Sequence, residues 1–324
     1  MIALQNVPFN FVEGLGFRRL IQELSPKYNL RGRNFFTDFV CTELYGKVAN
    51  KVKELIEKFD YMAFTSDIWS DPSSNASLPS LTCHGIAKNF DRSLIILKCE
   101  TFDDRHLGDI IAEKFDTMLT EWNISKEQVH CIIRDEGSNM KRAMRLAVLN
   151  DLDCAVHKMQ LAIRMKLTLF CQKSGIIESC VELLKPFEEA TRELSNSHTL
   201  ISSVIPIIKM LGKKLADYLT RPQDSDPIRV AVMTLKTEVS AKFSLLEENN
   251  LYVIATYLDP RYKHKFFTPV TEENIKDDIL KIRTNIENDV SNSQISPNFK
   301  AAKKIKMGDS LVKDTEQPGT SGTT

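Results

Sequence analysis

The sequence lacks an excess of charge of either sign, a long apolar run and the short motifs of several common enzyme classes. Its 324 residues carry 43 lysines and arginines against 43 aspartates and glutamates, so DNA binding would need a local basic patch. No run approaches the ~20 apolar residues of a membrane helix, and the N-terminal residues lack the charged region and apolar core that predict a secretory signal. It also contains no G-x-S-x-G motif and no phosphate-binding glycine loop, so serine-hydrolase and nucleotide-loop chemistry are not indicated.

Zinc-finger and disulfide patterns are missing as well. No C-x-x-C pair is followed by paired histidines. The cysteines are odd in number and lie mostly inside apolar runs, which favours reduced intracellular thiols. They are Cys41, Cys83, Cys99, Cys131, Cys154, Cys171 and Cys180. Cys83 and the adjacent His84 should point to opposite faces of a strand, and Cys154 with His157 supplies only two of the four ligands of structural zinc, so no zinc site is predicted.

The residues that are present predict a mixed α/β core. Short apolar runs bounded by turn residues predict strands at 61–66, 80–88, 93–100, 129–134 and 153–156. Apolar residues at helical spacing predict helices over 107–122 and after Asn139, and again from His157. The order β-β-β-α-β-α-β-α is typical of an RNase H-like fold, a mixed sheet with helices on its faces.

Four segments are expected along the chain. Residues 1–60 should form an N-terminal helical segment, in which Thr37 or Asp38 caps the second helix. Residues 61–169 form the RNase H-like core, and 170–290 form a large all-helical insertion region. The tail, 291–324, has few large apolar residues and is predicted to be disordered; Lys303, Lys304 and Lys306 make it a nuclear-localisation candidate.

Two aspartates stand at the ends of predicted strands. Asp67 follows Y-M-A-F-T-S, and Asp135 follows V-H-C-I-I-R. In α/β sheets, ligands bind at the carboxyl ends of strands, although a turn or cap is the commoner role of such an aspartate taken alone. Trp69 and Trp122 are expected to pack in the core.

Several stretches in a fixed order carry a family resemblance. They are P-F-N-F-V-E-G-L-G-F-R-R-L-I-Q-E-L-S-P-K-Y (8–28), F-T-S-D-I-W-S (64–70), L-T-C-H-G-I (81–86), R-D-E-G-S-N-M (134–140), C-A-V-H-K-M-Q-L-A-I (154–163) and A-T-Y-L-D-P-R-Y-K (255–263). In these stretches the chain resembles hAT-superfamily transposases and the zinc-finger BED domain proteins derived from them. The resemblance implies an RNase H-like catalytic core, interrupted by a helical insertion, that cuts DNA in the nucleus with two divalent metal ions.

The resemblance also implies roles for individual residues. Asp67 and Asp135 match the first and second catalytic carboxylates, which would bind Mg²⁺ or Mn²⁺ in an active enzyme, and Cys154 with His157 matches a C-x-x-H pair near that site. The family's third carboxylate, a Glu after the insertion, its C-terminal dimerisation region and its BED finger have no counterpart here. The family also usually carries Asn where Glu136 stands, so this chain places a like charge beside Asp135.

Three functions follow as alternatives. The first is a catalytically inactive, transposase-derived nuclear protein with inherited DNA or chromatin association and a transcription-regulatory role. The second is an active metal-dependent strand-transfer enzyme that uses Asp67 and Asp135 with a late acid such as Glu272, Glu273 or Glu287. The third is a partial transposon reading frame that acts at most as a scaffold, with a homo-oligomer or protein partner bound through the helical region. The best local basic cluster comprises Arg18, Arg19, Lys27, Arg31 and Arg33, and either a solvated helix face or a DNA-backbone contact accounts for it.

Overall fold

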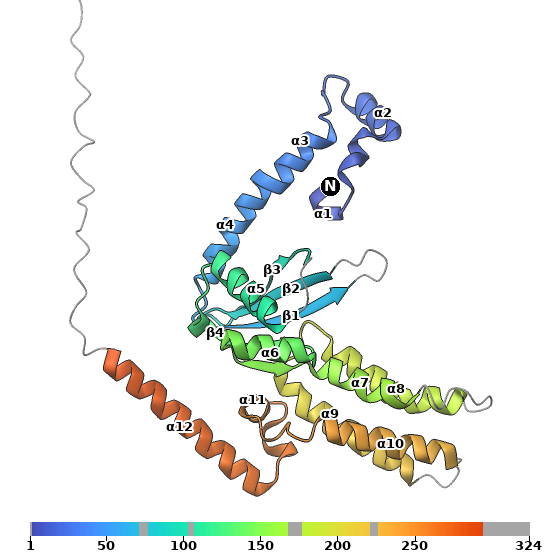
Figure 1. Cartoon of the computed structure of the whole chain (residues 1–324), viewed down its shortest axis with the longest axis vertical. Coiled ribbons are helices and arrows are strands. Elements are labelled where there is room, and N and C mark those ends of the chain that lie inside the picture. Colours follow the sequence, from blue (N-terminus) through green and yellow to red (C-terminus); the bar gives the residue numbers. More distant parts are fainter. Residues whose placement is uncertain (1, 71–76, 103–106, 168–176, 221–225, 294–324) are drawn as a thin grey trace, which may run out of the picture. The chain divides into compact units, whose positions relative to one another are not determined.

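The computed structural model of the protein describes residues 2–70, 77–102, 107–167, 177–220 and 226–293 (Figure 1). The chain divides into two compact units, 1–256 and 257–324. Residues 294–324 of the predicted tail lie outside the described residues. Within the described part, no helix is long and apolar enough to cross a membrane.

A five-stranded mixed sheet forms the centre of the first unit. Its strands are β1 (Met62–Ser70), β2 (Ser77–Ile86), β3 (Arg92–Cys99), β4 (Val129–Arg134) and β5 (Asp151–Asp153). They lie in the order β3-β2-β1-β4-β5. The pairs β1–β2 and β2–β3 are antiparallel, whereas β1–β4 and β4–β5 are parallel. The sequence therefore predicted a mixed sheet and its five strands correctly.

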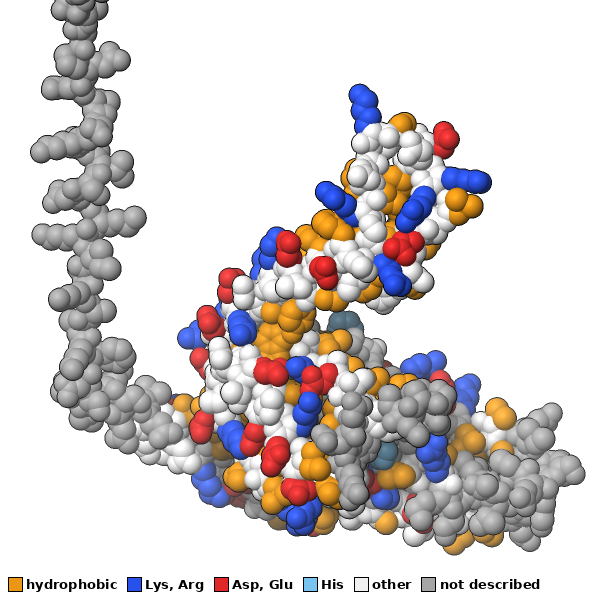
Figure 2. Space-filling view, turned by 45° about the horizontal axis from the view of Figure 1, so that its top comes forward, with side chains coloured by type: hydrophobic (Ala, Val, Ile, Leu, Met, Phe, Trp, Pro, Cys, Tyr) orange, Lys and Arg blue, Asp and Glu red, His pale blue; other side chains and the backbone are white. Residues whose placement is uncertain are grey.

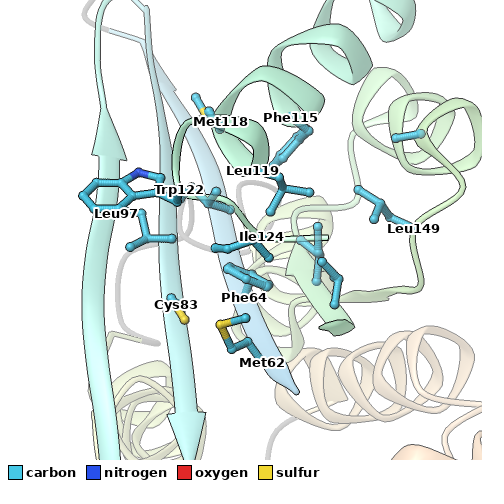
Figure 3. Packing of buried hydrophobic residues seen from close by; sticks show 14 of the residues in the cluster. Met62, Phe64, Cys83, Leu97, Phe115, Met118, Leu119, Trp122, Ile124 and Leu149 are labelled. Carbon is cyan, nitrogen blue, oxygen red and sulfur yellow. The ribbon is translucent and has the colours of Figure 1, made fainter. Parts of the chain in front are cut away.

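The main core lies between this sheet and α5 (Gly108–Glu121). Side chains in β2 alternate between buried and half-buried positions, so one face of the strand packs inward. In Figure 3, Phe64 of β1 and Leu97 of β3 lie toward Phe115 and Leu119 of α5. Trp122 is buried in this cluster, as predicted. The prediction for Trp69 was wrong: 57% of its surface is exposed, because it continues β1 beyond the part that the core covers.

Helices precede the sheet, as the sequence predicted. They are α1 (Ile2–Gln5), the 3-10 helix η1 (Phe9–Glu13), α2 (Leu15–Leu24), α3 (Arg33–Asp38), the π-helical stretch η2 (Phe39–Leu44) and α4 (Tyr45–Ile56). The predicted cap at Thr37 or Asp38 was wrong, because helical structure already begins at Arg33. The Thr37 hydroxyl donates to the Arg33 carbonyl oxygen one turn earlier (3.0 Å), which suits a position inside a helix.

Helices also dominate the chain after β4. They are α6 (Ser138–Ala147), α7 (Ala155–Leu167), α8 (Ile177–Leu194), α9 (Val204–Leu219), α10 (Asp226–Lys242), α11 (Asn250–Leu258) and α12 (Pro269–Ser293). The isoleucines of α12 are not buried as a group. Ile275 is 3% exposed, but Ile282 and Ile286 are 45% and 58% exposed.

Strand boundaries differ from the prediction, in β2 by up to three residues and in β1 and β5 with consequences for the site. β1 continues through Asp67 to Ser70, because β2 pairs with it as far as Ser70–Ser77 even though β4 pairs with it only to Thr65. β5 occupies 151–153 instead of 153–156, so α7 begins at Ala155 and not at His157. The boundaries predicted for the four segments of the chain stay predictions.

Candidate functional site

Asp67 and Asp135 lie near the end of the parallel β1–β4 ladder. The parallel register pairs Phe64 with Ile132 and Thr65 with Ile133. The ladder ends at the Thr65–Ile133 pair and β4 ends at Arg134, so each aspartate stands two residues beyond the last paired position of the ladder. Asp67 is exposed and Asp135 is half-buried, so solvent reaches this edge. Asp67 lies inside its strand and not at its end, because β1 continues to Ser70.

The loop after β4 fixes Asp135 by a local hydrogen bond. Its Oδ1 accepts the backbone N–H of Gly137 at 3.0 Å, an Asx turn that leads into α6. A Cβ atom added at Gly137 would stand 3.0 Å from the same oxygen, so a side chain at this position would crowd the Asp135 carboxylate. This close approach explains the glycine in R-D-E-G-S-N-M.

Cys154 and His157 lie next to this edge. The Cys154 N–H donates to the Arg134 carbonyl oxygen at 2.7 Å, which places Cys154 beside the end of β4. His157 lies in the first turn of α7, and both residues are half-buried. The other cysteine–histidine pair is divided as predicted: Cys83 is buried in the core, whereas His84 Nε2 contacts Thr65 Oγ1 at 3.1 Å on the other face.

A buried arginine joins β4 to β5. The Arg134 guanidinium forms ion pairs with Asp151 and Asp153, and its side chain is only 6% exposed. The same guanidinium donates from Nη1 to the carbonyl oxygen of Asp135 at 2.6 Å. Buried charges persist only when they are paired and hydrogen-bonded, and the two Nη atoms of Arg134 have three such partners, whereas its buried Nε has no hydrogen-bond partner among the described residues. It therefore anchors the backbone at the candidate site.

Asp153 is the most strongly perturbed carboxylate of this cluster. Its burial opposes ionisation, but hydrogen bonds from Lys158 and Arg134 outweigh that effect and lower the pKa of Asp153 to about 2. Lys158 Nζ lies 2.9 Å from Asp153 Oδ2, and Lys141 Nζ lies 3.5 Å from Oδ1. The Tyr252 hydroxyl of α11 donates to the Asp153 carbonyl oxygen at 3.3 Å, and burial raises the pKa of Tyr252 above its usual value.

Glu136, the additional acid beside Asp135, is balanced by two lysines. Its Oε2 lies 2.8 Å from Lys242 Nζ of α10, and its Oε1 lies 3.9 Å from Lys141 Nζ of α6. The like charge that the sequence places next to Asp135 is thus compensated in the fold. Among the described residues, no lysine or arginine forms an ion pair with Asp67 or Asp135 themselves.

The site supplies two hard oxygen ligands of the kind that Mg²⁺ and Mn²⁺ prefer. Within the described ranges, no three His, Cys, Asp or Glu side chains gather closely enough to hold a metal ion. Glu136, Asp151 and Asp153 are each engaged by lysine or arginine. Of the late acids, Glu272 pairs with Lys276 at 2.7 Å and Glu287 with Arg283 at 2.8 Å. The described residues therefore show no group of acids that could form a complete two-ion clamp.

The basic cluster predicted near the N-terminus is exposed. Arg18, Arg19, Lys27, Arg31 and Arg33 all have exposed side chains. The Arg31 guanidinium lies 5.6 Å from the centre of the Phe35 ring, a cation–π contact. Figure 2 shows Lys and Arg side chains projecting among apolar ones over these N-terminal helices.

Sequence reasoning missed the ion-pair cluster around Arg134. A charged residue at the end of the apolar run V-H-C-I-I-R was one signal, and the alternating acids of D-L-D were another. Their pairing depends on the β4–β5 register, which aligns Arg134 with Asp153. Nothing in the sequence indicated that Lys242 pairs with Glu136, because 106 residues separate the two.

Comparisons with known proteins show where the chain has relatives. No family model matches it. It is 21% identical to human zinc finger BED domain-containing protein 4 over 87% of this chain and 31% of that protein. It is 21% identical to mouse zinc finger BED domain-containing protein 6 over 99% of this chain and 43% of that protein. A putative AC transposase of maize is 24% identical over 55% of this chain and 23% of its own length.

The chain thus spans less than half the length of the two BED-domain relatives. Identity is low throughout, but one relative aligns with nearly the whole chain and two different kinds of protein are represented. These similarities support a transposase-derived family for the chain, one that includes zinc finger BED domain-containing proteins and hAT-like transposases.

Proposed function

We propose that the chain is a hAT transposase-derived nuclear protein that associates with DNA or chromatin, has a transcription-regulatory role and does not cut DNA as it stands. The family assignment is supported by the similarity of the chain to a zinc finger BED domain-containing protein and to a putative transposase. The strand order β3-β2-β1-β4-β5, with only β2 antiparallel to β1, supports an RNase H-like core as the ancestral catalytic fold.

The observation that carries the inactive assignment is the pairing of acids around Asp135. Cleavage by two metal ions needs several carboxylates that clamp both ions. At this edge Glu136, Asp151 and Asp153 are neutralised by Lys242, Arg134 and Lys158. Each of these carboxylates would have to give up a paired lysine or arginine before it could bind a metal ion. Asp67 and Asp135 are therefore relics of an ancestral pair.

DNA association rests on the N-terminal cluster and on the family. The cluster places five basic side chains within sixteen residues, 18–33, and all of them face solvent. Exposed lysines and arginines bind phosphates without reading sequence, and they displace counterions when they do so. Binding by this cluster should therefore be weak at high salt and independent of sequence.

We would test this proposal by fluorescence anisotropy with a labelled DNA duplex. Replacing Arg18→Glu and Arg19→Glu should weaken binding at least tenfold and reduce the slope of log affinity against log salt by about two. Lys213→Glu with Lys236→Glu is the matched control, because both lysines are exposed on α9 and α10. Equal losses of DNA affinity in the two double variants, or no loss in either, would refute the assignment of DNA contact to this cluster.

The second candidate is an active divalent-metal-dependent strand-transfer enzyme. Its support is that Asp67 and Asp135 both lie near the end of the parallel β1–β4 ladder, and that no ion pair engages either of them within the described part of the chain. It needs a further acid that is not already paired, such as Glu273, or one from a partner chain. Cleavage of plasmid DNA distinguishes it from the first candidate.

A further inference from the structure

The loop that carries Asp135 has little local support. It joins β4 to α6 through Glu136 and Gly137, and α6 begins at Ser138 without a side-chain cap on Gly137. Within the loop, the Gly137 N–H donates to Asp135 Oδ1, and the Gly137 carbonyl oxygen accepts the first hydrogen bond of α6 from the Lys141 N–H at 3.0 Å. A helix end without a capping side chain depends on other contacts to fix the direction from which the chain enters it.

One such contact comes from a distant part of the chain. Lys242 ends α10 and reaches Glu136 at 2.8 Å. The two side chains are 27% and 16% exposed, so this pair is shielded from solvent and salt better than a surface pair. Since α10 also packs along α7, its last residue is held near the end of β4 by the body of the helical region.

The contact continues into a line of alternating charges. Glu136 also faces Lys141, Lys141 faces Asp153, and Asp153 pairs with Arg134. Arg134 donates to the carbonyl oxygen of Asp135. Asp135 is therefore held from both sides: Arg134 holds its own carbonyl group, and Lys242 holds the side chain of the next residue.

We propose that Lys242 is a positioning residue, which fixes the Asp135 loop through Glu136 and couples the helical region to the candidate site. The inference rests on the proposed function only in treating Asp135 as a site residue. It predicts that loss of the Lys242 ammonium group loosens the Asp135–Gly137 turn while the rest of the fold keeps its stability.

Amide hydrogen exchange, measured by NMR on the full chain without metal or DNA, tests this proposal. Lys242→Met should speed exchange of the Gly137 N–H at least tenfold, because that N–H is bonded to Asp135 Oδ1. Lys242→Arg should keep exchange within twofold of the wild type. The matched control, Lys214→Met, removes an ion pair of similar length between α9 and α8 (Lys214–Glu189, 3.2 Å) and should leave Gly137 unchanged.

The double variant Glu136→Gln with Lys242→Met shows whether the effect passes through Glu136. If it does, the double variant should exchange at Gly137 no faster than the faster single variant, a non-additivity of coupled residues. Exchange at Gly137 that stays within twofold in Lys242→Met would overturn the proposal. So would an equal rise at the Leu211 amide of α9, since that would report general destabilisation. Because the measurement uses neither metal nor DNA, failure of the proposed function would leave its result standing.

Discussion

At the scale of single residues, the acids around Asp135 differ in their partners. Asp153 has contacts with Arg134, Lys158 and Lys141. Asp135 is next to Arg134 in sequence, but its carboxylate accepts a hydrogen bond from the backbone N–H of Gly137 instead. The cluster therefore separates acids that stabilise the fold from acids that remain available to a ligand.

Asp153 should make the stability of the protein depend on acid pH. Its pKa is lowered to about 2 in the fold, so its contribution is fully present above the unfolded value near 4 and is lost as pH falls toward 2. Urea unfolding at a series of pH values should show the stability difference between wild type and Asp153→Asn shrinking by about 2 kcal/mol from pH 5 to pH 2. A stability difference for Asp153→Asn that stays constant over this pH range would contradict the assignment.

The site was only partly predictable from its residues. The family resemblance indicated Asp67 and Asp135, and both lie two residues beyond the last pair of the β1–β4 ladder. Arg134 could not be assigned, because nothing in the local sequence says that acids seventeen and nineteen residues later will flank it. Partners so far apart are determined by strand register, and a single sequence gives register only weakly.

At the scale of secondary structure elements, the hydrophobic pattern predicted the existence and type of each helix and strand better than its boundaries. The alternation of β2 and the apolar face of α5 gave the core correctly. β1 was predicted too short, because its polar end is held by pairing with β2 and not by burial. The helix at Arg33 was predicted to start too late, because Thr37 resembles a cap in sequence but bonds inside the helix.

Gly85 shows where packing between elements leaves no room for a side chain. A Cβ atom at this position in β2 would lie 2.4 Å from the ring of Phe59, which is itself 2% exposed. Gly85→Ala should therefore lower the free energy of unfolding by about 1–3 kcal/mol through overpacking, measured by urea denaturation.

Gly46 supplies the contrasting variant. It lies in α4 with nothing within 4 Å of a built Cβ, so Gly46→Ala should raise stability by up to about 1 kcal/mol through helix propensity. A Gly85→Ala variant as stable as the wild type would contradict the close packing of Phe59 against β2 described above.

At the scale of the whole molecule, contacts distant in sequence join the sheet to the helical region. Tyr252 of α11 bonds to the backbone of β5, and Lys242 of α10 bonds to the loop after β4. Balanced net charge hides a local basic cluster in residues 18–33. The composition thus predicted that the net charge produces no overall electrostatic attraction to DNA. The function we propose depends instead on the local position of the basic residues.

Nicking of supercoiled plasmid DNA in Mg²⁺ or Mn²⁺ tests the central claim most directly. The wild type should be compared with Asp67→Ala/Asp135→Ala, and both should leave the plasmid supercoiled, because the acids beside Asp135 are already paired with lysine and arginine. Nicking by the wild type that disappears in the double variant would contradict this account and identify the chain as an active metal-dependent enzyme.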